Sequence, residues 1–392
     1  MTKVNVTGLG VVSALGISAK HHFNQLRSGV SGIGQFQRDG HLLYAGKVHF
    51  TNQQLSKLCE VDYSDYTSRT ALLGLLAAKE AFGRISFDSR FPAAFLNGTT
   101  VGGMDLSEQY FEGKSKGNPA DAALFTMHDL GANTDFIAKN LGEFQYINTI
   151  STACSSSANA IMLGAQLIQS GEYHRVLVGG TDALCKFTLE GFKSLMIYDS
   201  ELCQPFDANR RGLNLGEGAG YLLLESEDSI KESGNQCLAK VTGWANRNDA
   251  FHNTGTSPEG IGAQKAMQAA LEIANLKPSE IDYINAHGTG TQNNDSSELA
   301  AMEAVFGSEL PDFSSTKGAT GHTLAASGAI EAVFSVESLL QGCAYGNFNV
   351  SEPATASKAL LRKAVSKDIR HVMSNSFGFG GNSTSLIFSK SS

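Results

Sequence analysis

The chain has 392 residues, 42% of them hydrophobic and only 17% charged, so it can form a large apolar core and lacks the composition of a disordered protein. Its formal net charge of -8 argues against a general nucleic-acid binder, because such proteins are usually basic. The six cysteines are scattered without a C-x-x-C pair, which excludes a disulfide framework and a ribbon-type zinc site and favours a reducing cytoplasm. The N-terminus has no signal-peptide run, and no stretch reaches about 18 uninterrupted apolar residues, so we expect no contact with a membrane.

The first part of the chain alternates predicted strands with predicted helices. Strands are expected at 4–12, 93–97, 146–151, 175–179 and 218–225, and helices at 19–28, 67–82, 155–169 and 226–233. The segment 125–141 is expected to be loop and helix, 189–207 is expected to be rich in loops, and a polar, surface-facing stretch begins at Asp105.

Near residue 235 the same alternation starts again. Strands are expected at 238–244, 281–285, 371–375 and 383–388, and helices at 261–274, 296–305 and 325–340. Alternating strands and helices favour parallel sheets that helices cover on both faces. We therefore predict a duplicated α/β architecture with halves at 1–235 and 236–392.

Cys154 is the strongest candidate for a nucleophile. It lies between a predicted strand and a helix that begins at Ser155, and a helix N-terminus favours a thiolate. Its small neighbours leave room for a substrate. A buried structural cysteine is the alternative from the residues alone, and the other five cysteines lack this setting.

Two histidines and a lysine follow in the second half. His287 comes just after a predicted strand and opens His-Gly-Thr-Gly-Thr, where glycines allow close backbone approach and Thr289 and Thr291 offer hydroxyls. A simple turn is the alternative for this motif. Lys317 and His322 lie in a tight glycine loop that is not a P-loop. Glu298 is expected to pair with Lys317 and so keep the lysine ammonium charged. This positive charge would favour the neutral forms of His287 and His322.

A glycine-rich loop, Asn375-Ser-Phe-Gly-Phe-Gly-Gly-Asn382, follows a strand near the C-terminus. Such a loop can supply a backbone N–H to an oxyanion and a mobile aromatic gate. Together these pieces suggest a thiolate that accepts an acyl group and two histidines that stabilise an enolate formed by decarboxylation. A Cys-His hydrolase would need only one histidine, and no close cluster of cysteines, histidines and carboxylates predicts a metal site.

The sequence resembles the β-ketoacyl-(acyl-carrier-protein) synthase family, of the elongating type, in the thiolase-like superfamily. The resemblance spans nearly the whole chain and rests on six motifs in the expected order: Val6-Thr-Gly-Leu-Gly-Val-Val-Ser-Ala-Leu-Gly16, Thr152-Ala-Cys-Ser-Ser156, Arg211-Gly-Leu-Asn-Leu-Gly-Glu-Gly-Ala-Gly220, Asn285-Ala-His-Gly-Thr-Gly-Thr291, Ser315-Thr-Lys-Gly-Ala-Thr-Gly-His322 and Asn375-Ser-Phe-Gly-Phe-Gly-Gly381.

The resemblance implies a role for each candidate. Cys154 is the acylated nucleophile, His287 and His322 assist decarboxylation and condensation, and Lys317 lies near them with Glu298 as its partner. The N–H groups of Cys154 and Phe379 form the oxyanion hole, and Phe379 is the gate to the acyl pocket. Substrate contacts are implied for the following residues: Thr254, Thr289, Thr291, Val101, Phe377, Gly378 and Gly380.

The implied fold is a duplicated, layered α-β-α-β-α sandwich. It usually forms a homodimer, and the substrates arrive on the phosphopantetheine arm of an acyl carrier protein, with no other cofactor. Basic residues that could meet an acidic carrier protein are Arg69, Lys193, Arg210 and Arg211.

Some features depart from the common pattern of the family and leave the pathway open between fatty-acid and specialised polyketide or polyene synthesis. Asn382-Ser383 stands where Thr-Asn is common, and the Pro-rich stretch of many fatty-acid elongating members is missing between Asp121 and Leu141. Val101 matches a position that limits chain length, and a small residue there would permit extra depth. The alternatives are a chain-length-determining partner subunit in a heterodimer, whose known relatives usually lack the cysteine, and a thiolase acting on coenzyme A thioesters.

Overall fold

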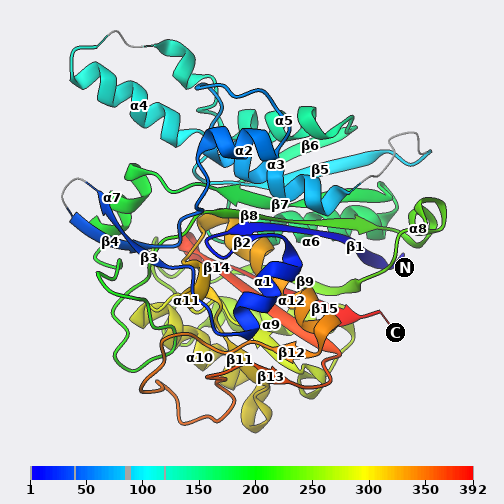
Figure 1. Cartoon of the computed structure of the whole chain (residues 1–392). Coiled ribbons are helices and arrows are strands. Elements are labelled where there is room, and N and C mark those ends of the chain that lie inside the picture. Colours follow the sequence, from blue (N-terminus) through cyan, green and yellow to red (C-terminus); the bar gives the residue numbers. More distant parts are fainter. Residues whose placement is uncertain (1, 39–40, 84–89, 119–120, 392) are drawn as a thin grey trace.

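A computed structural model describes residues 2–38, 41–83, 90–118 and 121–391 (Figure 1). The first half contains β1 (Val4–Ser13), β2 (Gly16–Ile17), α1 (Ala19–Arg27), β3 (Gly34–Arg38), β4 (His41–Ala45), α2 (Asn52–Leu58), α3 (Arg69–Phe82), β5 (Ala93–Gly98), α4 (Met104–Ser115), η1 (Ala122–Phe125), α5 (Leu130–Leu141), β6 (Tyr146–Ile150), α6 (Ser156–Ser170), β7 (Arg175–Asp182), α7 (Lys186–Ser194), β8 (Gly218–Glu225) and α8 (Glu227–Ser233).

The second half contains β9 (Ala239–Asn248), α9 (Ile261–Ala274), η2 (Pro278–Glu280), β10 (Tyr283–Asn285), α10 (Gln292–Phe306), η3 (Gly307–Glu309), β11 (Asp312–Ser314), α11 (Lys317–Thr320), η4 (Leu324–Ala326), α12 (Ser327–Gln341), β12 (Cys343–Ala344), β13 (Val365–Ser366), β14 (His371–Gly378), η5 (Phe379–Gly381) and β15 (Asn382–Lys390). None of the described helices is long and apolar enough to cross a membrane.

The strand order repeats between the two halves. The main sheet runs β11-β10-β14-β15-β9-β1-β8-β7-β5-β6, and the antiparallel pair β1 and β9 joins its two sides. Outward from this pair, the sequence β1-β8-β7-β5-β6 has the same connectivity as β9-β15-β14-β10-β11, with the same parallel and antiparallel pairings.

The expected parallel sheets are only partly correct. The outer strands β5, β6 and β7 are parallel to one another, as are β10, β11 and β14. β8 and β15 run antiparallel to their neighbours. β14 and β15 are antiparallel because the connection between them, Phe379–Gly381, is far too short for the crossover that parallel strands need.

Helices and sheet form five layers (Figure 1). α3 covers the outer face of β1 and β8, while α6 and α12 lie between the two sides of the sheet and contact strands of both. α9 covers β9 and β15 on the far side and packs on α10. Three large buried apolar clusters fill the spaces between these layers. The predicted duplicated α-β-α-β-α sandwich of the thiolase-like fold is confirmed.

Four of the described α-helices lie where none was predicted, namely α2, α4, α7 and α11. α7 falls in the segment expected to be rich in loops, and it is a short helix whose only buried side chain is Leu189. α4 occupies the stretch after Asp105 that was expected to be merely polar, and it projects from the body of the molecule in Figure 1. In α4 the helical periodicity of hydrophobic side chains is weak, whereas α7 is only nine residues long, too short for such a pattern to stand out in the sequence.

Candidate active site

Cys154 lies in a sharp turn between β6 and α6. Ala153, just before it, has a positive φ of 54°, and the Ser156 N–H donates to the Ala153 carbonyl. The loop after β14 passes close by, because a Cβ on Gly378 would lie 2.9 Å from the Thr152 carbonyl oxygen and 3.2 Å from the Cys154 nitrogen. Glycine at 378 therefore lets the two loops come together.

Burial has the largest effect on the pKa of the Cys154 thiol. It raises the pKa of Cys154 to about 11, although the charge of Lys317 and the backbone N–H of Phe379 both favour the thiolate. The pKa is thus shifted in the opposite direction to that expected from the helix N-terminus alone. The N–H groups of Phe379 and of Cys154 itself both lie close enough to the sulfur to lower its pKa, and two donors that converge in this way can also bind a negatively charged oxygen.

We expect the alkylation of Cys154 by iodoacetamide to become about tenfold faster with each pH unit between pH 7 and pH 9, because only the thiolate reacts and its pKa is about 11. Peptide mass spectrometry would measure the modification at Cys154 itself. The half-exposed Cys237 provides an internal comparison in the same digest. A rate that reaches its plateau below pH 8 would show that the resting enzyme holds a thiolate.

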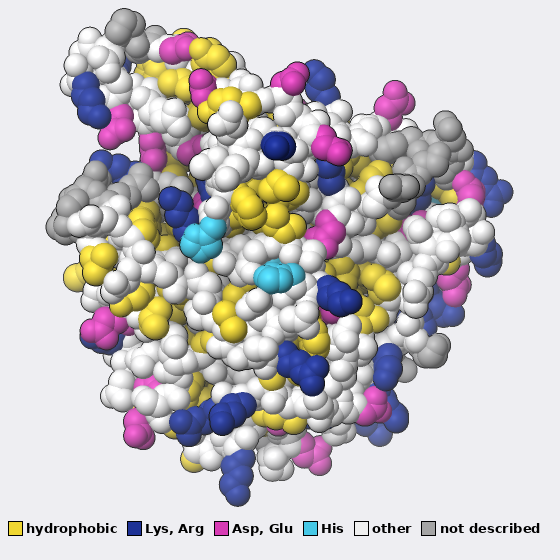
Figure 2. All heavy atoms as spheres, viewed as in Figure 1, with side chains coloured by type: hydrophobic (Ala, Val, Ile, Leu, Met, Phe, Trp, Pro, Cys, Tyr) yellow, Lys and Arg dark blue, Asp and Glu magenta, His cyan; other side chains and the backbone are white. Residues whose placement is uncertain are grey.

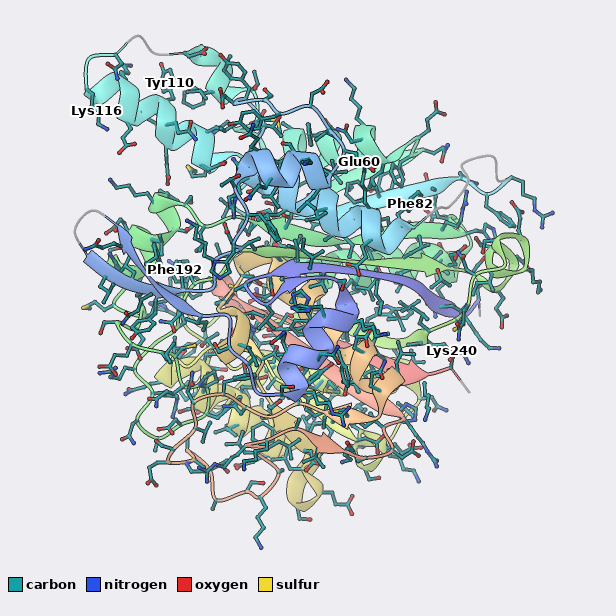
Figure 3. All side chains as sticks on the ribbon, in the orientation of Figure 1. Glu60, Phe82, Tyr110, Lys116, Phe192 and Lys240 are labelled. Atoms are coloured by element: carbon teal, nitrogen blue, oxygen red, sulfur yellow. The ribbon has the colours of Figure 1, made fainter. Side chains whose placement is uncertain are left out.

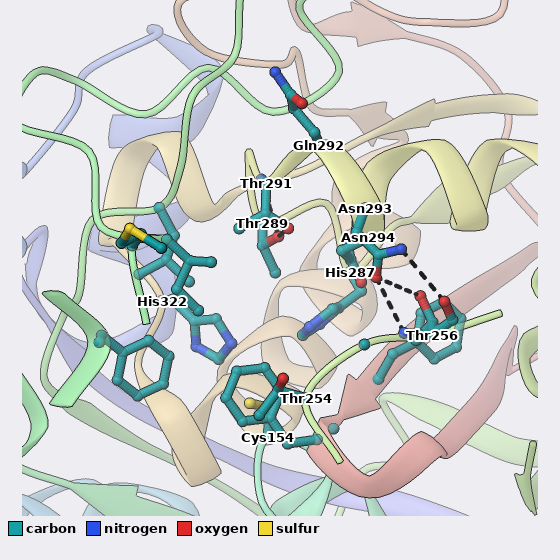
Figure 4. Close-up of a pocket in the computed structure, with 18 of the residues that line it drawn as sticks. Cys154, Thr254, Thr256, His287, Thr289, Thr291, Gln292, Asn293, Asn294 and His322 are labelled. Atoms are coloured by element: carbon teal, nitrogen blue, oxygen red, sulfur yellow. Dashed lines mark hydrogen bonds between the residues drawn. The ribbon is translucent and has the colours of Figure 1, made fainter. Parts of the chain in front are cut away.

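His287 and His322 face one another across the space above Cys154 (Figure 4), with ring centroids 5.4 Å apart. His287 follows β10, and His322 follows the short helix α11. Burial, and then the nearby charge of Lys317, lower the pKa of both imidazoles well below the usual value, so both are neutral at neutral pH.

The tautomers follow from the hydrogen bonds. Nδ1 of His322 accepts the backbone N–H of Leu324 at 3.0 Å, so its proton is on Nε2. Nδ1 of His287 lies 3.2 Å from the Lys317 ammonium, which can only donate, so His287 also carries its proton on Nε2. A neutral pair with two Nε2–H donors can stabilise a developing oxygen anion.

The predicted ion pair between Glu298 and Lys317 is wrong. The Lys317 ammonium pairs with Glu331 of α12 at 2.5 Å and also donates to the His287 carbonyl at 2.7 Å. Glu298 instead accepts the backbone N–H groups of His287 and Gly288, each at 2.8 Å, and so fixes the turn after β10. The sequence did not identify Glu331, because tertiary packing decides which carboxylate pairs with Lys317. The one indication in the sequence was that Glu331 is a carboxylate inside the apolar stretch 325–340, where a buried charge needs a partner.

We expect Glu331→Ala to lower the free energy of unfolding by about 3–5 kcal/mol, because it leaves the fully buried Lys317 ammonium without its counter-charge. Urea unfolding of the purified variant would measure this. The double variant Lys317→Met/Glu331→Leu should recover most of the loss, because neither buried charge remains. Equal stability of Glu331→Ala and the wild type would show that the pair does not hold this part of the core.

Cys154 and the two histidines line one cavity of about 270 Å³ (Figure 4). Most of the residues predicted for substrate contacts lie on its wall, together with the predicted gate Phe379: Thr254, Thr289, Thr291, Phe377 and Gly378. The hydroxyls of Thr289 and Thr291 lie 2.9 Å apart. Residues that the sequence did not single out also line it, among them Phe192, Met196, Gln292, Asn293 and Asn294.

Two predicted contact residues lie elsewhere. Gly380 has its N–H bonded to the Asn253 carbonyl at 2.8 Å and is not part of the cavity wall. Val101 is buried in an apolar cluster with Leu189 and Leu324 and is not one of the residues that line the cavity. Phe192 of α7 packs against that cluster and stacks on the Phe379 ring, with centroids 5.8 Å apart (Figure 3 labels Phe192). Phe192 and Phe379 both line the cavity, as does Leu213 of the Val101 cluster, so this cluster lies directly against the cavity wall.

Two of the four basic residues considered for a carrier protein are unsuited to it. Arg69 forms a largely buried ion pair with Glu217, and Arg210 is buried beside Asp295. Arg211 is half exposed and lines the cavity, although Asp199 and Glu201 contact it. Basic and acidic side chains are interspersed over the face shown in Figure 2, so this face carries no single-signed charge.

Comparison with known proteins agrees with this geometry. The family model described as Beta-ketoacyl synthase, N-terminal domain, matches residues 1–229, and Beta-ketoacyl synthase, C-terminal domain, matches residues 238–351. The 3-oxoacyl-(acyl-carrier-protein) synthase 2 of Staphylococcus aureus (strain COL) is 30% identical, over 99% of this chain and 98% of the relative.

Solved structures are similar over the whole chain. The ishigamide ketosynthase/chain length factor has a TM-score of 0.93 and 29% identity, with 100% of both chains covered. The ketosynthase ApeO in complex with its chain length factor ApeC, from Xenorhabdus doucetiae, has a TM-score of 0.87 and 32% identity, with 100% of this chain and 98% of that chain covered. The chain belongs to the beta-ketoacyl synthase family and is a condensing enzyme of the acyltransferase type.

Proposed function

We propose that Cys154 accepts an acyl group from an acyl carrier protein and that the enzyme extends it with a malonyl unit, releasing carbon dioxide. The observation that carries this proposal is the convergence of one thiol and two neutral, Nε2–H-donating histidines on one cavity. A hydrolase would need a histidine that accepts the nucleophile's proton, whereas here both imidazoles present donors.

The steps follow from the positions of the groups. The Cys154 sulfur, after losing its proton, attacks the acyl thioester carbonyl, and the carrier's thiolate leaves and takes up a proton. The tetrahedral oxyanion accepts hydrogen bonds from the N–H groups of Cys154 and Phe379. When the malonyl thioester loses carbon dioxide, its enolate oxygen accepts hydrogen bonds from His287 and His322. The enolate carbon then attacks the acyl group, and the Cys154 sulfur leaves.

The mouth of the cavity suits the phosphopantetheine arm. The exposed Thr254 lines the cavity together with the hydroxyls of half-buried Thr291 and buried Thr289, and Asn293 holds the Thr254 loop through Thr256 (Figure 4). We propose that these groups bind the arm and that Arg211 lies beside the docked carrier. Leu213 belongs both to the cavity wall and to the apolar cluster around Val101, which supports an acyl chain reaching this cluster; the chain-length role of Val101 stays a prediction.

We further propose that the chain is divided near residue 235 into two halves, which the repeated strand order supports, and that it acts in the cytoplasm without a bound cofactor. The partner is a second copy or a related subunit. Two of the similar structures pair a ketosynthase with a chain length factor, which favours testing the second option, while Cys154 favours a catalytic role in either assembly.

The test is reconstitution with malonyl-carrier protein and a panel of saturated and polyunsaturated acyl-carrier proteins, read by intact mass spectrometry. We expect a β-ketoacyl product two carbons longer than the preferred primer, and the preferred primer would identify the pathway. Size-exclusion chromatography with light scattering would show the homodimer. Carbon dioxide release without any extended product, from all primers and with a candidate partner subunit added, would contradict the proposed condensation.

A further inference from the structure

Six polar side chains form a continuous hydrogen-bonded network behind the turn that carries Cys154. The network, called here the Asn382 network, joins residues of both halves of the chain: Thr152, Ser155, Asn159, Asn246, Asn382 and Thr384. Asn382 lies at the position where the sequence departs from the Thr-Asn that is common in the family.

Asn382 is the centre of this network. Its Oδ1 accepts hydrogen bonds from the Ser155 hydroxyl at 2.6 Å, from Asn246 Nδ2 at 2.7 Å and from Asn159 Nδ2 at 3.2 Å. The three donors come from the catalytic turn, from β9 and from the first turn of α6. One oxygen atom therefore connects three separate elements.

The remaining hydrogen bonds connect the other members of the network to one another. The Thr384 hydroxyl donates to Asn159 Oδ1 at 2.8 Å and accepts from Asn246 Nδ2 at 2.8 Å, and Asn159 Nδ2 also donates to the Thr152 hydroxyl at 2.8 Å. Ser155 and Thr384 are fully buried. Since a buried polar group is costly to leave without its partner, such a network favours one fixed arrangement of its elements.

That arrangement spans the candidate oxyanion hole. Ser155 directly follows Cys154, and Asn382 lies three residues after Phe379, so the network connects the two segments whose N–H groups approach the sulfur. On the other side the backbone of Gly378 lies against that of Thr152. The loop that carries Phe379 is thus held to the catalytic turn by backbone contact on one side and by the network on the other.

We propose that Asn382 is a positioning residue that fixes the spacing of the Cys154 and Phe379 N–H groups. The proposal rests on the proposed function, because the two N–H groups matter only if an oxyanion forms there. An oxyanion hole is effective when its donors lie about 2.7–3.1 Å from the oxyanion, so a small shift of one loop lowers the rate of acyl transfer. Binding of the carrier-linked substrate at the mouth does not depend on this spacing.

The experiment compares Asn382→Leu with Asn382→Asp in the full-length enzyme, using the acyl-carrier protein that the wild type prefers. Leucine has a similar size but accepts no hydrogen bond, whereas aspartate keeps an oxygen for all three donors. We expect Asn382→Leu to lower the single-turnover rate of Cys154 acylation about 10- to 100-fold, with KM within twofold of the wild type. Asn382→Asp should retain the rate within about fivefold.

A matched control is Asn133→Leu. Asn133 is a fully buried amide on α5 that donates to the Met127 and Asp129 carbonyls, and it lies outside both the Asn382 network and the cavity wall. The same substitution there should lower thermal stability while leaving the acylation rate per folded molecule unchanged. If Asn382→Leu does not fold, Ser155→Ala removes the Ser155 hydroxyl, which bonds Asn382 and also the carbonyl and hydroxyl of Thr152, and should lower the acylation rate about fivefold.

The positioning role would be overturned if Asn382→Leu is acylated as fast as the wild type. If Ser155→Ala is used in place of Asn382→Leu, an unchanged acylation rate of Ser155→Ala would overturn it in the same way. A loss in Asn382→Asp as large as in Asn382→Leu would also overturn it, because the hydrogen-bond acceptor is then not what matters. A wild type that no primer acylates would contradict the proposed function itself, so the two claims fail in different ways.

Discussion

Cys154→Ala is expected to abolish the acyl-enzyme adduct and to lower the rate of β-ketoacyl formation by a factor on the order of 10⁴ or more, since removal of a covalent nucleophile leaves only binding and electrostatic stabilisation. Cys154 is the one cysteine among the described residues that line the cavity, and its thiol lies beside the two histidines and the candidate oxyanion hole. Intact mass spectrometry after incubation with acyl-carrier protein measures the adduct directly.

The matched control for this variant is Cys237→Ala, which removes a more exposed thiol outside the cavity. It should leave both the adduct and the rate of product formation unchanged. An adduct of full stoichiometry on Cys154→Ala would show that another side chain is the acyl acceptor. The assignment of Cys154, and the mechanism built on it, would then be wrong.

His322→Ala is expected to lower the rate of condensation about 10²- to 10³-fold, the usual effect of removing one donor to a developing oxyanion, while self-acylation falls far less. The reason is geometric. His322 is held by Leu324 and Ser327 so that its Nε2–H faces the cavity, whereas the acylation step uses the N–H groups near the sulfur. Rates of adduct formation and of adduct discharge by malonyl-carrier protein separate the two steps.

His371→Ala serves as the control, because His371 lies on β14, outside the cavity wall, and is bonded to Ser389. Both rates should stay at the wild-type value in that variant. Parallel loss of acylation and condensation in His322→Ala would argue that His322 also acts on the thiol, and the separation of roles would have to be abandoned.

The alternation of strands and helices predicted the layered fold well, since the long apolar strands and amphipathic helices carry strong periodic signals. It did not predict strand direction. Nothing in the local pattern of β14 and β15 distinguishes a hairpin from a crossover except the shortness of the connection Phe379–Gly381, which was interpreted as a functional loop. α7 was missed because its only buried residue is Leu189.

For the site, the sequence pointed to the residues that carry unusual chemistry, and the structure brings Cys154, His287 and His322 together around one cavity. The sequence could not predict which side chains are brought together by tertiary packing. Glu331 comes from the buried helix α12, and Phe192 comes from α7, so only the folded chain shows that they meet Lys317 and Phe379. The pKa of the thiol also depends on burial, which outweighs the helix N-terminus.

The most direct test of the central claim is a pulse and chase on the wild-type enzyme. The protein is first loaded with a labelled acyl group from acyl-carrier protein and freed of excess primer, and malonyl-carrier protein is then added. We predict that the label is mapped to Cys154 after the pulse and moves in the chase to a β-ketoacyl product two carbons longer, with release of carbon dioxide. Label that stays on the protein, or leaves it as a free acid without extension, would contradict the account.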